Sequence, residues 1–257
     1  MESRAAWSLE CRGAYEAAAA SVSVLGRIGT GSNSDECDPD PLRRRAEACL
    51  DGLAEVARTE AATAALKVRL AAEYTDAAQA MAAPTVAPRE SSAQEMAVIA
   101  EVACVLTVSE RTAGALLSEA HELTTSLPLT MSALQAGTIS WQHARIVVDE
   151  TTNLDPAGAA ALEAHFLDPD APDPARGCPA GELVPSRFRH KARTWRERHH
   201  PVSIEKRHTK GAQDRRLEYA PDLDGMAWLS AYLPAHQASG IWDRTTTAAR
   251  ALQGPHE

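Results

Sequence analysis

The sequence predicts a mainly α-helical protein, with long antiparallel helices in a bundle, then a small basic α+β part with one β-hairpin and a terminal helix. The 257 residues include only 2 Phe, 4 Tyr and 5 Trp, so Ala, Leu and Val must build the core, which favours helices. Apolar residues also recur at alternating spacings of three and four, the helical period. With 44% apolar and 24% charged residues, the composition excludes wholesale disorder and a fibrous class.

Residues 1–40 precede any long helical pattern. Gly, Ser, Asn and Pro cluster between Gly26 and Pro41 and interrupt the apolar period. We therefore expect a poorly ordered leader over 1–40, with one short helix near Ala14.

A heptad-like stripe begins after Pro41 and continues to the neighbourhood of Ala83. Its members are Ala46, Cys49, Leu53, Ala57, Ala61, Ala64, Val68, Ala71, Tyr74, Ala78 and Met81. This spacing is typical of a coiled coil and predicts one helix about 60 Å long at 1.5 Å per residue. A seam made mostly of Ala buries little area, so the helix needs a partner. That partner is either the following helices or a second copy, in a homodimer formed through residues 41–83.

Three or four shorter helices are expected next, completing a helical domain over residues 41–167. Ser109 and Ser140 stand where helix N-caps belong, and Gly137 is placed to close a short helix. The segment 168–185 holds five prolines and is typical of a linker. Residues 186–257 then carry basic helices, a hairpin with a turn at Asp224-Gly225, and a last helix.

Basic residues concentrate in one band. Between Arg187 and Arg216, 11 basic residues face 3 acidic ones, giving the band a charge of +8 within a chain of net charge −9. Such a local excess can attract nucleic acid even when the whole chain is acidic. The same excess is also explained by ion pairs with the acidic remainder of the chain.

Several classes of function lack support. No run of 18 apolar residues occurs, so we expect neither a membrane span nor a secretory signal. The 5 cysteines are scattered without a CxxC pair, which favours a reduced, cytoplasmic protein without a metal site. The sequence also lacks a Gly-rich phosphate loop, GxSxG and HExxH, and indicates no cofactor and no small-molecule substrate.

Two segments carry a family resemblance. The stretch from Leu127 to Arg145 (LPLTMSALQAGTISWQHAR), and the later pattern Asp214-Arg-Arg, Asp224-Gly-Met-Ala-Trp-Leu and Leu233-Pro, occur in the expected order. The chain thereby resembles the bacterial family called domain of unknown function 222, or 13E12 repeat, over about Pro41 to Gln253. Within the first stretch, His143 and Arg145 lie two residues apart on a helix, so we expect capping or packing roles for them.

The resemblance implies a helical domain that usually precedes an HNH nuclease module, in which histidines and an asparagine bind one divalent metal. No such motif is visible, since the chain ends where the module is expected. His199, His200 and His208 imitate part of it, but asparagine occurs only at Asn33 and Asn153. We therefore expect no catalytic residue and no metal ligand.

Three hypotheses remain. The preferred one is a non-catalytic accessory domain that binds DNA weakly and without sequence preference. Helical spacing places its predicted contacts on shared faces: Arg189, Arg193 and Arg196 on one helix, and Lys206 and Lys210 on the next. The alternative is a structural or dimerisation module with no nucleic-acid role. A self-sufficient nuclease, the third, is disfavoured by the missing motif.

Overall fold

The computed structural model describes residues 7–29, 40–81, 88–175, 180–200, 209 and 211–253. These residues are mainly helical and include one antiparallel two-stranded hairpin followed by a helix, which confirms the predicted fold class. The chain divides into two compact units, Met1–Arg196 and Glu197–Glu257, and each is described by itself.

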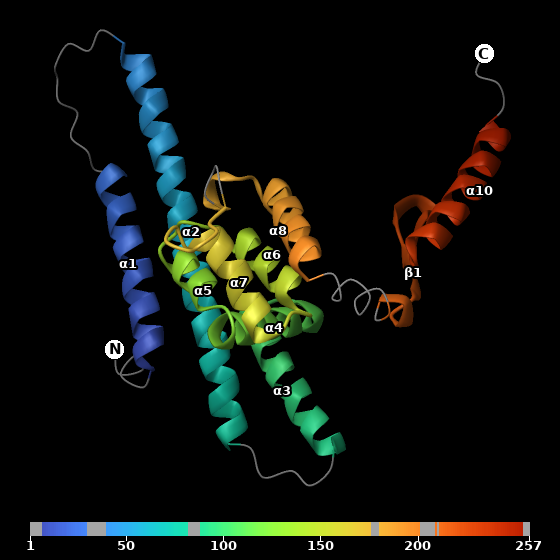
Figure 1. Ribbon diagram of the computed structural model, residues 1–257, viewed down its shortest axis with the longest axis horizontal. Helices are drawn as coiled ribbons and strands as arrows, with labels where there is room; N and C mark the ends of the chain where they lie inside the picture. Colours follow the sequence, from blue (N-terminus) through green and yellow to red (C-terminus); the bar gives the residue numbers. More distant parts are fainter. Residues whose placement is uncertain are drawn as a thin grey trace. The chain divides into compact units, whose positions relative to one another are not determined.

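Helix α2 (Pro41–Met81) is the longest element of the first unit, as the stripe predicts (Figure 1). Its 41 residues extend about 60 Å at 1.5 Å per residue. The middle of the stripe is buried among other helices of the same chain, with Ala61, Val68 and Ala71 in the core, whereas Met81 at its end is exposed. Residues 41–51 of the first half are all exposed. The long helix is therefore covered within the chain along only part of its length.

Helix α1 (Leu9–Gly29) includes the short helix expected near Ala14, but its 21 residues occupy much of the segment 1–40 that was expected to be a poorly ordered leader. It packs antiparallel to α2 (Figure 1), burying Cys11, Ala14 and Ala18 at helical spacing. At its start, the backbone N–H and the hydroxyl of Ser8 donate to the Glu73 carboxylate at 2.9 and 2.7 Å. The glycines near its end are tolerated because α2 stabilises the helix through packing.

Five shorter helices follow; the first four contact α2, and the last packs on the third and fourth of them (Figure 1). They are α3 (Pro88–Leu106), α4 (Glu110–Thr125), α5 (Pro128–Gln135), α6 (Trp141–Thr151) and α7 (Pro156–Leu167). The Ser109 hydroxyl accepts the Thr112 N–H at 3.2 Å, so this residue caps α4 as predicted. The helices bury a core of aliphatic side chains that includes Leu123, Leu127, Met131 and Leu134.

Gly137 closes α5, as expected, because the tight turn after this helix needs a left-handed backbone conformation. Its φ of 73° lies in the left-handed region, and a Cβ at this position would approach the Arg58 backbone to 3.2 Å. The turn after α5 therefore lies directly against α2.

Helix α8 (Pro185–His199) follows the predicted linker, but the boundary between units falls after Arg196 rather than within 168–185. The reason is burial: Phe188 and Ala192 of α8 are fully enclosed in the first unit's core. The Pro-rich segment thus connects two parts of one unit.

The second unit contains strands β1 (Arg216–Pro221) and β2 (Ala227–Tyr232), with Tyr219 opposite Leu229, and helix α10 (Ala235–Gln253). Asp224 and Gly225 adopt φ angles of 58° and 76° in the connecting turn, as the Asp-Gly pair predicts. The predicted basic helix over Val202–Ala212 lies mostly outside the described residues.

Candidate nucleic-acid interface

Helix α8 carries most of the described part of the basic band, and its two apolar residues fix its orientation. The Phe188 ring lies 5.4 Å, centroid to centroid, from both the His143 and the Phe166 rings. Together with Ala192, this ring anchors α8 on α6 and α7. The basic residues are therefore divided between the two flanks of an anchored helix.

Three of the predicted contacts lie on the flank that faces the acidic residues of α6. Arg189 Nη1 lies 3.0 Å from Asp149 Oδ2, and Arg193 Nε lies 3.7 Å from Glu150 Oε1. Arg196 forms an ion pair with Glu150 in which the two side chains are only 3% and 1% exposed.

This arrangement changes the interpretation of the predicted site. The structure does bring Arg189, Arg193 and Arg196 together on one flank, but Arg196 is buried and has no surface to offer a phosphate. Arg189 and Arg193 retain partial exposure beside their carboxylate partners. Lys206 and Lys210 lie outside the described residues.

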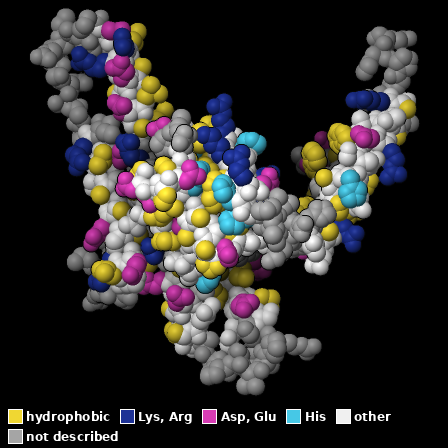
Figure 2. All heavy atoms as spheres, viewed as in Figure 1, with side chains coloured by type: hydrophobic (Ala, Val, Ile, Leu, Met, Phe, Trp, Pro, Cys, Tyr) yellow, Lys and Arg dark blue, Asp and Glu magenta, His cyan; other side chains and the backbone are white. Residues whose placement is uncertain are grey.

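A second basic stripe occupies the other flank of α8. Arg187, Lys191 and Arg198 follow at intervals of four and seven residues, which places them on one helical face, and all three are exposed. Within the described part of the chain, none of them is paired with a carboxylate. Figure 2 shows Lys and Arg side chains gathered over α8 with histidines beside them. We call these three residues the outer stripe.

The sequence contained a signal for the outer stripe. Phe188 and Ala192 are the apolar residues in the first turns of a basic helix, and four-residue spacing makes them its buried face. What the sequence could not show is which flank meets Asp149 and Glu150, because those acids are about forty residues away.

The signature stretch from Leu127 to Arg145 supplies structure rather than a site. His143 forms a capping box with Ser140, whose hydroxyl donates to Nδ1 at 2.7 Å, while its Nε2–H donates to the Leu183 carbonyl at 2.8 Å. Arg145 Nε donates to Glu119 of α4 at 2.7 Å. The expected capping role is confirmed for His143, whereas Arg145 forms a half-exposed ion pair instead.

Glu163 is the buried carboxylate of α7 and holds the start of α5. Its Oε1 accepts hydrogen bonds from the backbone N–H and the hydroxyl of Thr130 at 2.7 and 2.6 Å. Burial raises the pKa of Glu163 above its ordinary value, and the hydrogen bonds from Thr130 oppose part of that rise. This carboxylate joins two helices through a satisfied polar contact.

The described residues contain no cluster of side chains that could bind a metal ion. Among residues 7–29, 40–81, 88–175, 180–200 and 211–253, no three His, Cys, Asp or Glu side chains gather as metal ligands.

Over the same residues, no single helix is long and apolar enough to cross a membrane. One pair, Ser92–Leu106 with Glu110–Thr125, passes by length and composition but is bent by 106°.

Fold and surface together define a helical domain with a basic helix face. The family model described as "Domain of unknown function (DUF222)" matches residues 50–256. The chain belongs to this family. A search of curated proteins and a search of solved structures each found no match.

Proposed function

We propose that the chain is a non-catalytic accessory domain that binds nucleic acid weakly and without sequence preference through its basic band. The observation that carries the proposal is the outer stripe, where Arg187, Lys191 and Arg198 are exposed and unmatched by acids among the described residues. Cations at such positions attract the phosphate backbone of any sequence.

The stripe's geometry suits phosphates better than bases. Arg187 and Arg198 are eleven residues apart, or about 16 Å along the helix axis, so the stripe extends over several phosphates of one strand. Three neutralised phosphates give a slope of log K against log salt of about −2.7, and the rest of the band steepens it. Weak binding follows, with dissociation constants of about 10⁻⁴ to 10⁻⁶ M at physiological salt.

The test compares two variants of the same helix. Replacing Arg187, Lys191 and Arg198 together by Gln removes the outer stripe, while the matched control replaces Arg189 and Arg193 by Gln. Affinity for two unrelated duplexes is measured by fluorescence anisotropy across a salt series, alongside the melting temperature.

We expect the outer-stripe variant to bind both duplexes at least tenfold more weakly at low salt. Its salt slope should be flatter by about 2.7 and its melting temperature unchanged. The control should keep most of its affinity. Wild-type protein that shows no binding even at low salt contradicts the proposal, and so does equal loss in the two variants.

A second function, dimerisation, is favoured by exposed leucines in the first half of α2. Leu42, Leu50 and Leu53 are 77%, 66% and 65% exposed there, although they follow the helical period of a contact face. Under this proposal a second copy covers them. Sedimentation equilibrium should then show a dimer that Leu50→Glu with Leu53→Glu dissociates, whereas a wild-type monomer at all concentrations contradicts it.

A further inference from the structure

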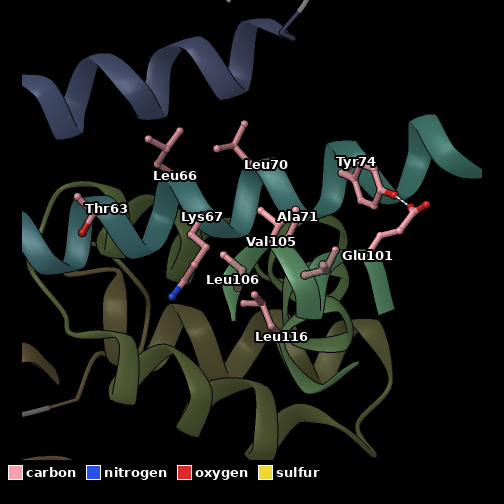
Figure 3. Close-up of a pocket in the computed structure, with 11 residues that line it drawn as sticks. Thr63, Leu66, Lys67, Leu70, Ala71, Tyr74, Glu101, Val105, Leu106 and Leu116 are labelled. Atoms are coloured by element: carbon pink, nitrogen blue, oxygen red, sulfur yellow. Dashed lines mark hydrogen bonds between the residues drawn. The ribbon is translucent and has the colours of Figure 1, made fainter. Parts of the chain in front are cut away.

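An apolar groove lies between α2 and α3, remote in sequence from the basic band. Its volume is about 650 Å³, and its walls include Leu66 and Leu70 of α2, Val105 and Leu106 of α3, and Leu116 of α4. Figure 3 shows these side chains around the groove. The volume lies within the range of small-molecule sites, which are commonly about 300–1,000 Å³.

Two opposite charges lie apart along the groove. Among the described residues that line it, Lys67 holds the one positive charge and Glu101 the one negative charge. The Tyr74 hydroxyl donates a hydrogen bond to the Glu101 carboxylate (Figure 3). Lys67 lies seven residues before Tyr74, about 10 Å along α2, so the two charges are well separated along the groove.

Lys67 makes no ion pair among the described residues, and Glu119, which lines an adjoining pocket with it, is paired with Arg145. The Lys67 side chain is exposed and leaves α2 on the side of Leu106 and Leu116 (Figure 3). An exposed ammonium group beside apolar walls favours a carboxylate over an uncharged head by a modest factor, because water screens part of the attraction. Glu101 repels the same group and accepts only an uncharged tail.

We propose that this groove binds an amphipathic monocarboxylate, a fatty-acid-like chain of about ten carbons. The carboxylate pairs with Lys67, and the alkyl chain runs past Leu70 and Val105 towards Tyr74. Each buried methylene should raise affinity about fourfold, and the two charges should fix the ligand's direction. This proposal is independent of nucleic-acid binding by α8.

Three ligands with the same chain and different heads test it: decanoate, decanol and decylamine. Binding to the full chain is measured by calorimetry below the micelle-forming concentration of each. We expect decanoate to bind about fivefold more tightly than decanol, the upper end for an exposed ion pair. Decylamine can place its ammonium group only at Glu101, so its affinity should not depend on Lys67.

Two variants and a matched control assign the site. Lys67→Met should reduce decanoate affinity to that of decanol and leave decanol unchanged, whereas Lys67→Arg should restore it. Lys191→Met, at another exposed lysine on α8, should change nothing. Val105 is 83% exposed, so Val105→Trp should fill the groove and weaken all three ligands at unchanged melting temperature. Decanoate binding that is indifferent to Lys67→Met, or equal for decanoate and decanol in the wild type, overturns the proposal.

Discussion

Replacing Arg196 should destabilise the first unit far more than replacing its neighbour Arg189, although the two look alike in the sequence. Arg196 pairs with Glu150 where both side chains are almost fully buried, at 3% and 1% exposure. Removing one partner of a buried pair leaves the other charge uncompensated and costs about 3–5 kcal/mol. Arg193 remains 3.7 Å from Glu150 and softens the loss, so we expect about 3 kcal/mol.

Arg189 provides the matched control. Its pair with Asp149 is 42% and 54% exposed, and exposed pairs contribute about 0–1 kcal/mol. Urea unfolding followed by tryptophan fluorescence should therefore separate Arg196→Met from Arg189→Met by about 2 kcal/mol or more. For a unit of this size, the loss in Arg196→Met lowers the melting temperature by roughly 6–12 °C.

A double variant tests the cause. Glu150→Leu combined with Arg196→Met removes both charges, so most of the lost stability should return. Equal costs for Arg196→Met and Arg189→Met would refute the reasoning, because the burial of the pair would then have no energetic consequence. The reasoning is also refuted if the double variant is less stable than Arg196→Met alone.

Three further predictions concern the helical unit. Ala61→Pro should cost about 3 kcal/mol or more, since it interrupts α2 within the core, and an unchanged urea midpoint contradicts a continuous helix. Cys11 is buried where α1 docks, and burial raises its pKa to about 11. A maleimide at pH 7 should therefore label the exposed Cys49 and Cys104 quickly, and Cys11 only when the protein unfolds. Rapid labelling of all three thiols excludes the docked helix. The pKa of Glu163 is raised in the folded state, so its protonated form stabilises the fold below pH 4 and this stabilisation is lost at higher pH. The free energy of unfolding of Glu163→Gln, relative to wild type, should therefore increase from pH 4 to pH 7. A difference that does not change with pH contradicts this.

Local patterns predicted most helices because the relevant interactions span a few residues. The Ser109 cap, the Gly137 turn and the period from Ala61 to Ala71 all depend on neighbours within one or two turns. A short helix near Ala14 was expected, but the full length of α1 and its docking on α2 were not, although Cys11, Ala14 and Ala18 have the helical spacing. Its glycines favoured a loop, and the contact that decides otherwise is with Glu73, 65 residues from Ser8.

The candidate site was predicted less well because its partners are distant in sequence. Spacing correctly placed Arg189, Arg193 and Arg196 on one flank, but spacing carries no information about Asp149 and Glu150. Burial of that flank depends on how α8 packs on α6. The residues left for a ligand were consequently those on the opposite flank.

The two main hypotheses for the basic band therefore apply to opposite flanks of one helix. Ion pairing with the acidic body accounts for the flank of Arg189, Arg193 and Arg196, whereas the outer stripe retains unmatched charge among the described residues. A triple replacement of the paired flank would weaken any DNA complex simply by unfolding the unit, since the Arg196 pair is buried. Only a variant confined to the outer stripe separates loss of phosphate contacts from loss of stability, because exposed and unpaired cations can be removed without leaving a buried charge behind.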